Sequence, residues 1–449
     1  MNSVILPLRV SHTFVRRLGW IFAAVCVFFC ATTWLCLDVF QHPARYPASW
    51  NGYTIMSILR EMNTQEETCV ADWAKSLGHS LPGWAALFCF ALDCRLQRGQ
   101  RGHWLRYGWL LLAAIFIGMS FDEIASIHER LGSLTSLRPF HHGTYQLGWV
   151  YVLTVPIALV ALAMLWFACA RVLKQSRTAF ALLALGILLY GTKPLHEHFE
   201  MKMWAAAGWV ENWARPIYLN VFEEVCEMFG GLFAALGIWT WALSVLREKG
   251  NKEPLVLSLP ARRVMIFALT ILAALAALMF TLENLGLVVN DELGTPKLWF
   301  PSILAFLCFA VLLRLSIVEK TTRAGWFFAA GHSLWLSAFW GAGIWGFFDL
   351  GHLEPLRKAL YIVMYLATLA VGLFLLRQSR LTAGRLGYLL WIVLLFFALV
   401  RERLYSIEIG FFASAALLLT LIFELAAAES VAAADALTAT ELPTVTGAR

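Results

Sequence analysis

Carboxylate and imidazole side chains gather in three short segments of a chain that is otherwise strongly apolar. The segments are SFDEIASIHE at 120–129, KPLHEHFE at 193–200 and EEVCEMFG at 223–230. Several carboxylates on one helical face repel each other at membrane depth unless protons, basic groups or a metal compensate them. Imidazole together with carboxylate is a ligand set that suits zinc, iron or manganese. The three segments therefore form a candidate metal or acid site.

The candidate residues are assigned two roles. The predicted metal ligands are Asp122, His128, His196, His198, Glu223 and Glu224. The predicted catalytic carboxylates are Glu123, Glu129 and Glu227. A bound divalent metal would activate a water molecule, and a carboxylate outside the ligand set would act as general base. The alternative interpretation is structural, with the acids capping helices or pairing with nearby arginines.

The spacing of these residues matches no complete metal signature. HExxH is absent from the sequence, and His128 follows Glu123 by five positions, where the di-iron carboxylate motif needs three. None of the nine cysteines forms a CxxC pair, which argues against zinc-ribbon and thioredoxin-like sites. The metal is therefore a hypothesis that rests on residue types and on their position.

The elements that carry these residues are predicted to be membrane-spanning helices. Of the 449 residues, 60% are hydrophobic and 14% are charged, whereas soluble domains carry about 25% charged residues. Apolar runs of about 20 residues recur along the chain, and this length crosses the hydrocarbon core of a bilayer. The sequence thus predicts an all-α polytopic bundle of about twelve spans, at 18–37, 82–99, 107–127, 148–170, 179–199, 216–245, 264–287, 300–317, 325–348, 358–376, 386–404 and 409–426.

The distribution of charge predicts the orientation of these spans. Most of the 35 Lys and Arg residues fall in one set of alternate loops, and most of the 29 Asp and Glu residues fall in the other. The positive-inside rule then places both termini in the cytoplasm. With that orientation, the ends of the third and fifth spans and the start of the sixth lie at the outer interface. The three acidic and histidine-containing segments are therefore expected to meet there.

The chain is predicted to divide into two sets of six spans. A six-span membrane domain at 1–245 contains the candidate site and a long outer loop at 38–81. A cytoplasmic linker at 246–263, polar and with two prolines, leads into a second six-span domain at 264–426. The Ala- and Thr-rich tail at 427–449 is predicted to be disordered. The third and ninth spans both end with Asp, His and Glu in that order, which raises the hypothesis of an internal duplication.

The motifs S-x-D-E-x-x-x-x-H-E at 120–129 and E-E-x-x-E-x-x-G at 223–230 resemble those of a group of uncharacterised bacterial multipass membrane proteins. The stretch from Glu61 to Asn63 is similar, in divergent form, to a Glu-Asn-containing stretch before the second span in that group. The resemblance covers roughly residues 18–245. It implies a bacterial inner membrane protein and no established activity.

Three classes of function are compatible with these features. The first is a metal-dependent hydrolase that cleaves a lipid-linked or interfacial substrate. The second is a proton-coupled transporter, because membrane carboxylates can carry protons and two sets of six spans are common among transporters. The third is a structural or partner-binding membrane protein. The acids gather at one surface and not at mid-membrane, which favours the enzyme. Membrane lipids are the expected partners, and nucleic acid is not, because no basic patch is interleaved with aromatic residues.

Overall fold

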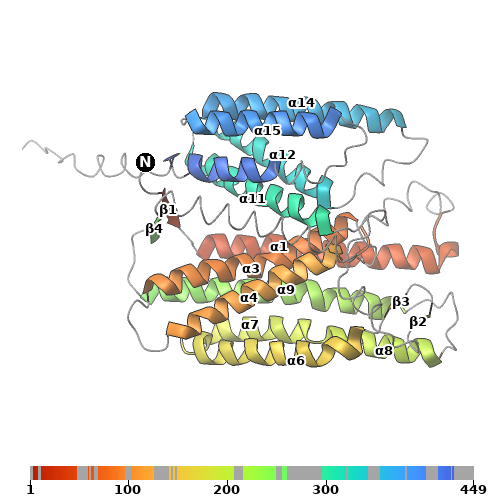
Figure 1. Ribbon diagram of the computed structural model, residues 1–449. Helices are drawn as coiled ribbons and strands as arrows, with labels where there is room; N and C mark the ends of the chain where they lie inside the picture. The colour runs from red at the N-terminus through yellow and green to blue at the C-terminus, as the bar shows by residue number, and fades with distance from the viewer. Residues whose placement is uncertain are drawn as a thin grey trace, which may run out of the picture. The chain divides into compact units, whose positions relative to one another are not determined.

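The computed structural model describes residues 4–8, 12–47, 59, 62–64, 69–96, 103–125, 141–142, 145–146, 149–206, 216–248, 255–259, 296–319, 322–341, 354–379, 382–400, 413–425 and 427–428. Over these residues the chain is almost entirely helical, as the sequence predicts (Figure 1). The chain forms two compact units. The N-terminal unit comprises Val10–Asn251 with Asn290–Pro296, and the C-terminal unit comprises Met1–Arg9, Lys252–Val289 and Lys297–Arg449.

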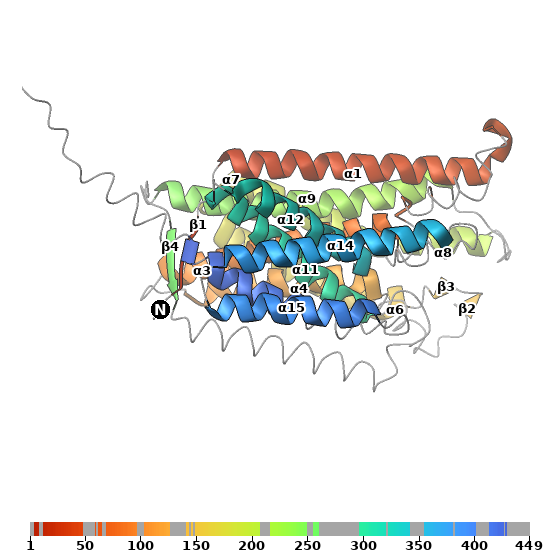
Figure 2. The ribbon, with the colours of Figure 1, turned by 90° about the horizontal axis from the view of Figure 1, so that it is seen from above.

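The N-terminal unit is a bundle arranged around helix α9. Its α-helices are α1 (His12–Gln41), α3 (Val70–Leu96), α4 (Tyr107–Ala125), α6 (Trp149–Phe167), α7 (Arg177–Tyr190), α8 (Lys193–Ala206) and α9 (Ile217–Glu248). Shorter elements are the 3-10 helices η1 (Pro43–Arg45) and η3 (His103–Arg106), the π-helix η5 (Ala168–Val172), and the paired strands β2 (His141–His142) and β3 (Tyr145–Gln146). Helix α9 packs against α1, α3 and α7, and these helices run side by side (Figures 1 and 2). Helix α8 also contacts α9, whereas α4 packs on α3, and α6 contacts α4, α7 and α8.

Glycines allow α7 and α9 to approach closely. A Cβ atom on Gly186 of α7 would lie 2.6 Å from the backbone nitrogen of Ala234, and one on Gly237 of α9 would lie 2.6 Å from that of Leu183. Side chains at these two positions would force the helix backbones apart. Association through small residues is the usual solution in lipid, where burial of apolar surface between helices gives little driving force. The glycines thus fix the position of α7 beside the acidic helix.

Six of the described helices are long and apolar enough to cross a membrane. They span His12–Gln41, Trp104–Glu123, Leu153–Val172, Arg177–Glu200, Ile217–Glu248 and Trp299–Val318. On α6, the large apolar side chains of Val155, Leu159, Leu162 and Trp166 are exposed, as expected for a surface that faces lipid. These helices indicate a membrane protein. The expected count of twelve spans and the cytoplasmic termini stay predictions, and the expected span at 264–287 lies outside the described residues.

Helix α3 differs most from the expected elements. It begins at Val70, although the apolar run predicts a span that starts only at 82 and assigns 70–81 to an outer loop. The first turns of α3 are helical and largely buried, with Lys75 and His79 both nearly inaccessible. A hydropathy window misses this segment because Asp72, Lys75 and His79 lower its average. Charged partners compensate for that polarity, and they come from other helices.

The ends of two other helical segments also differ from expectation. The fifth span, expected at 179–199, is divided at Gly191 and Thr192 into α7 and α8, and Pro194 lies in the first turn of α8. Proline is tolerated there because the first amide groups of a helix have no partner within the helix. Ala427 and Ala428, assigned to a disordered tail, are helical and buried, and 429–449 lie outside the described residues.

The C-terminal unit is built from a second set of helices. They are α11 (Pro296–Val318), α12 (Arg323–Gly341), α14 (Glu354–Gln378), α15 (Thr382–Val400) and a helix at Ala413–Leu425. Strand β1 (Val4–Leu8) pairs with strand β4 (Leu255–Leu259) in antiparallel register in the same unit. The core of the unit contains the large buried side chains of Trp326, Tyr388 and Trp391. The end of the expected ninth span, with Asp349 and His352, lies outside the described residues.

The same serine contact joins one helix pair in each unit. In the N-terminal unit, the hydroxyl of Ser76 on α3 lies 3.0 Å from that of Ser120 on α4 and donates to the Ser120 carbonyl. In the C-terminal unit, the hydroxyl of Ser302 on α11 lies 3.2 Å from that of Ser337 on α12 and donates to the Ser337 carbonyl. Each pair thus joins the start of one helix to the later part of the next.

An aromatic contact repeats as well. Trp109 of α4 packs edge-on against Phe167 with ring centroids 5.0 Å apart, and Trp326 of α12 packs edge-on against Phe374 at 5.2 Å. Each tryptophan precedes the serine of its own helix by eleven positions, 109 to 120 and 326 to 337. The tryptophan and serine thus recur at the same spacing in α4 and α12, and the duplication stays a hypothesis.

Candidate functional site

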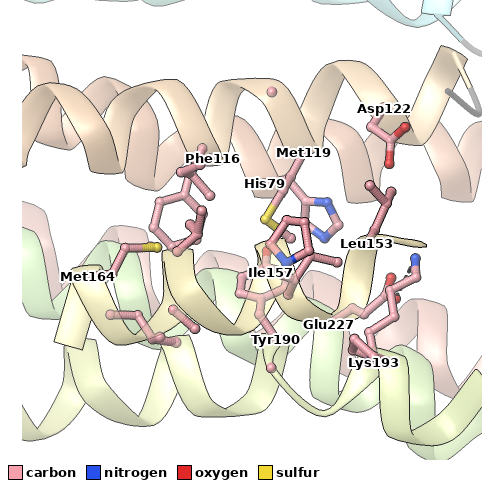
Figure 3. Close-up of a pocket in the computed structure, with 18 of the residues that line it drawn as sticks. His79, Phe116, Met119, Asp122, Leu153, Ile157, Met164, Tyr190, Lys193 and Glu227 are labelled. Carbon is pink, nitrogen blue, oxygen red and sulfur yellow. Dashed lines mark ion pairs between the residues drawn. The ribbon is translucent and has the colours of Figure 1, made fainter. Parts of the chain in front are cut away.

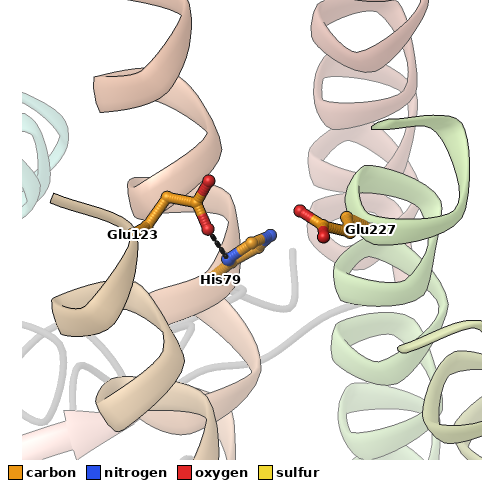
Figure 4. A group of neighbouring side chains, drawn as sticks. All are labelled: His79, Glu123 and Glu227. Atoms are coloured by element: carbon orange, nitrogen blue, oxygen red, sulfur yellow. Dashed lines mark ion pairs between the residues drawn. The ribbon is translucent and has the colours of Figure 1, made fainter. Parts of the chain in front are cut away.

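The candidate site lies where the start of α3, the end of α4, the junction of α7 with α8 and the start of α9 meet. Lys75 and His79 come from α3, Glu123 from α4, and Glu227 from α9. Figure 4 shows the His79 ring between the carboxylates of Glu123 and Glu227. Every one of these side chains except Glu123 is buried, and Glu123 is about 13% exposed. The polar groups must therefore compensate one another.

Lys75 is the centre of this compensation. Its ammonium nitrogen lies 2.5 Å from Glu123 Oε1, 3.1 Å from Glu224 Oε2 and 2.8 Å from Glu227 Oε2. Three carboxylates from two helices thus share one buried cation. Taking charges of this kind out of water costs several kcal/mol per ion, and the cost is offset only where geometry and partners are good. The lysine is therefore expected to offset part of the cost of burying these acids.

A second lysine joins the same group from α8. Lys193 Nζ lies 2.8 Å from Glu227 Oε1, the oxygen of Glu227 that does not contact Lys75. We refer to Lys75, Glu123, Lys193, Glu224 and Glu227 as the ion cluster. With all five groups ionised, two positive charges face three negative charges, and one negative charge remains. The cluster can therefore accept a proton or a further cation.

His79 is the imidazole of the site. Its Nδ1 lies 3.6 Å from Glu123 Oε2, and neither ring nitrogen has a hydrogen-bond partner among the described residues. The ring packs edge-on against Tyr190, with centroids 5.3 Å apart. Buried imidazole nitrogens normally have a hydrogen-bond partner, so an imidazole that lacks one is positioned for a ligand.

His79, Glu123 and Glu227 form a group that could hold a metal ion. One ligand atom from each residue can be chosen so that all three lie within 4.8 Å of one another. An imidazole with two carboxylates is a known ligand set for zinc and for iron. The ammonium of Lys75 contacts both carboxylates, so a bound metal would share them with the lysine or displace it. The geometry is thus compatible with the expected divalent metal, and it does not identify which ion binds.

The predicted residues of the α4 and α9 motifs come together as expected. A carboxylate oxygen of Glu123 and one of Glu227 lie within 4.8 Å, which confirms that the two motifs converge. Glu224 joins them through Lys75, and Glu223 is buried in the same turn of α9. Asp122 lines the cavity described below. His128 and Glu129 lie outside the described residues.

The two histidines of α8 are placed differently. His196 packs against the ring of Phe222 at 5.3 Å, and His198 packs against Phe199 at 6.3 Å. The group that could hold a metal among the described residues contains His79 and neither of these histidines. The segment 193–200 contributes Lys193 to the ion cluster instead.

Sequence reasoning did not select Lys75, His79 or Lys193. Lys75 and His79 lie in the segment 38–81, which the sequence predicts to be an outer loop, and Lys193 begins the segment 193–200, where only the two histidines are predicted ligands. A signal was present, because Lys75 and His79 are four positions apart and share one face of a helix. A second signal is the need of Glu123, Glu224 and Glu227 for a buried cation. Lys75 meets that need.

Polar contacts hold α3 against α4 at both ends of the pair. Near the site, Ser76 is hydrogen-bonded to Ser120 as described above. At the other end, the fully buried Asp93 of α3 accepts hydrogen bonds from Arg171 Nη2 at 2.5 Å and Nε at 3.1 Å. Trp109 of α4 also donates its indole N–H to Asp93, at 3.2 Å. Both ends of the α3 and α4 pair are thus fixed, which holds Lys75, His79 and Glu123 in register.

A cavity of about 380 Å³ adjoins the ion cluster (Figure 3). Its walls are mainly apolar side chains of α4, α6 and α7, among them Phe116, Ile157 and Met164. At one end it is lined by the polar residues His79, Asp122, Glu123, Lys193 and Glu227. The volume is within the range of small-molecule pockets, and apolar walls with a few converging polar groups are typical of them.

Comparisons with known proteins add one match. Residues 73–243 match the family model of a domain of unknown function (DUF8692). No curated protein and no solved structure matches the chain. The matched segment begins two residues before Lys75 and extends past Glu227, so it contains every residue of the ion cluster and His79. The candidate site thus lies wholly within the matched segment.

Proposed function

We propose that the chain is a membrane-embedded, metal-dependent hydrolase that acts on a lipid-linked or interfacial substrate. One observation carries the proposal: the group formed by His79, Glu123 and Glu227, which could hold a metal, lines the polar end of an apolar cavity. A hydrolase for a lipid-linked substrate needs both features side by side. The remaining negative charge of the ion cluster supports the binding of a cation there.

The side chains of the cluster suit distinct roles in this reaction. A divalent metal held by His79, Glu123 and Glu227 would supply Lewis acidity and lower the pKa of a bound water. Glu224, outside that ligand set and linked to it through Lys75, would accept the proton of the water as general base. Lys193, which lines the cavity, would stabilise negative charge that develops on the substrate. Relative to the sequence-based assignment, Glu123 and Glu227 thus become metal ligands, and Glu224 becomes the general base.

Metal content tests this proposal directly. Protein purified without chelator is expected to contain about one zinc, iron or manganese ion per chain, measured by elemental mass spectrometry. Replacing His79 with Ala and Glu227 with Gln together should remove the ion, because losing two ligands of a small coordination shell weakens binding strongly. The matched control is His332→Ala, since His332 is also buried but is hydrogen-bonded to Thr368 in the C-terminal unit. The control should keep the metal.

Hydrolysis is tested with a defined lipid mixture. Metal-loaded protein is incubated with phosphatidylethanolamine, phosphatidylglycerol and cardiolipin, and the products are identified by mass spectrometry. Cleavage products should require the metal and disappear in Glu224→Gln. Protein that holds no stoichiometric metal and gains no thermal stability from added zinc, iron or manganese would eliminate the metalloenzyme.

A proton-coupled transporter is the second candidate. The observation that favours it is the ion cluster itself. A buried lysine that contacts three carboxylates can exchange a proton with them when one of the carboxylates moves. The two functions differ in their requirement for metal. A chain without metal whose reconstituted vesicles show substrate-dependent proton uptake, lost in Lys75→Met, would support the transporter over the enzyme.

The proposal includes twelve spans, with both termini in the cytoplasm of a bacterium and the chain in its inner membrane. The ion cluster then lies at the outer surface. Reporter fusions after residues 100, 175, 255 and 380 should report the inner compartment. Fusions near 60, 138, 205 and 353 should report the outer compartment. Two or more reversed positions would contradict this topology and the placement of the cluster.

A further inference from the structure

The cavity beside the ion cluster has one wall that is thin and built from small residues. Gly118 and Ala114 of α4 line it and are exposed, and no atom lies within 4 Å of the position that a Cβ on Gly118 would take. Pro156 of α6 lines it and is also exposed. Helices α4 and α6 both belong to candidate membrane spans. The cavity is therefore open between two helices that would face the hydrocarbon of a bilayer.

The two ends of the cavity differ in chemistry. At the end away from α8, Phe116 and Met164 offer only apolar surface. At the end near α8, His79 and Lys193 face it beside the carboxylates, as Figure 3 shows. A water-soluble substrate would leave the apolar part unused. A pure hydrocarbon would leave the buried imidazole nitrogens without a partner, which costs free energy.

We propose that the cavity binds one hydrocarbon chain of an amphipathic lipid, which enters from the bilayer between α4 and α6 and places its polar end at His79 and Lys193. The inference names the substrate class of the proposed hydrolase and rests on that function. The occupant is a single-chain amphiphile or one acyl chain of a larger lipid, because a cavity of about 380 Å³ is at the small end of the range for drug-sized ligands.

A photoactivatable fatty acid with a diazirine in its chain tests the inference. The full-length protein is reconstituted in phosphatidylcholine nanodiscs with the probe and irradiated, and labelled peptides are mapped by mass spectrometry. Labels are expected on the cavity side of α4 and α6, at residues such as Phe116 and Met164. Gly118→Trp should reduce this labelling at least tenfold, because the indole would fill the open part of the cavity.

The chain offers a matched control. Gly331 of α12 is also an exposed helical glycine with no atom within 4 Å of its Cβ position, and it lies in the C-terminal unit. Gly331→Trp should leave the labelling of α4 and α6 unchanged. Ala161→Phe, in the α6 wall of the cavity, is a second blocking variant in case Gly118→Trp does not fold. Labelling that persists in both blocking variants, or that covers exposed residues of α6 such as Leu162 equally, would overturn the inference.

Metal analysis of the same samples separates the two proposals. Gly118→Trp should keep its metal, because Gly118 lies outside the group formed by His79, Glu123 and Glu227. Wild-type protein that binds metal but shows no cavity labelling would overturn the lipid inference and leave the metal site standing. Cavity labelling without any metal would support the lipid pocket and refute the hydrolase.

Discussion

Replacing Lys75 with methionine is expected to lower the free energy of unfolding by about 3–5 kcal/mol, the range found when one partner of a buried ion pair is removed. The reason is specific to this site. Lys75 contacts three carboxylates, at 2.5 to 3.1 Å, and its own side chain is only 5% exposed. Methionine has a similar length, so the change removes charge and little packing. Unfolding in mixed micelles, followed by circular dichroism, measures the loss.

An exposed ion pair supplies the control for this loss. Arg45 lies 3.2 Å from Asp38 at the end of α1, and its side chain is 64% exposed. Arg45→Met should cost far less than Lys75→Met, because water and salt screen surface pairs. A second control removes a carboxylate together with the lysine. Lys75→Met with Glu224→Gln should recover part of the loss, because one uncompensated charge is then absent. Equal losses for Lys75→Met and Arg45→Met would show that the ion cluster is not buried in the folded protein.

The sequence was sufficient to predict the helical class and the meeting of two motifs. Both inferences depend on local patterns: apolar runs of membrane length, and carboxylates within one arc of a helix. Alternation of spans then placed the end of α4 and the start of α9 on the same side. The approach of Glu123 to Glu227 follows from that arrangement, and the structure bears it out.

The rest of the site could not be read from local patterns, because it depends on compensation between helices. Lys75 makes the start of α3 too polar for a hydropathy window, yet it is buried because Glu123, Glu224 and Glu227 surround it. Long-range pairing of this kind is a tertiary effect. His79 could not be chosen over other histidines for the same reason, since its role depends on α4 and α9.

The spacing of Trp109 and Ser120 equals that of Trp326 and Ser337, and it can be seen in the sequence. The hypothesis of a duplication rests instead on Asp, His and Glu at the ends of the third and ninth spans. The ion cluster, in contrast, lies in the N-terminal unit. A duplicated scaffold with one charged site would explain why the acids gather mostly in one half.

The second large effect is expected at the opposite end of α3, where Asp93 binds Arg171 and Trp109. Asp93→Ala should lower the free energy of unfolding by about 3–5 kcal/mol, because it leaves the guanidinium without its anion. It also leaves the indole N–H of Trp109 without its acceptor. Asp93 is fully buried and accepts two hydrogen bonds from one guanidinium, a bidentate geometry that is among the strongest pairings in proteins.

A double-mutant cycle with Arg171→Ala isolates the pair. The double variant should be more stable than the sum of the two single losses predicts, by about 0.5–3 kcal/mol, because residues in contact couple over that range. The ring of Trp241, 5.3 Å below the guanidinium, contributes to the Arg171 single loss and cancels in the cycle. If the two single losses of unfolding free energy sum to the loss of the double variant within about 0.5 kcal/mol, direct pairing is contradicted.

The Asp93 variants also separate stability from the chemistry of the site. Asp93 lies near the end of α3 and Lys75 near its start, so the pair with Arg171 is remote from the ion cluster. Folded Asp93→Ala protein, kept below its unfolding temperature, should bind metal and the lipid probe as the wild type does. Lys75→Met should instead change metal binding, because the Lys75 ammonium contacts the carboxylates that would hold the metal. If Asp93→Ala abolished metal binding in folded protein, the register of α3 against α4 would be the property that the site depends on most.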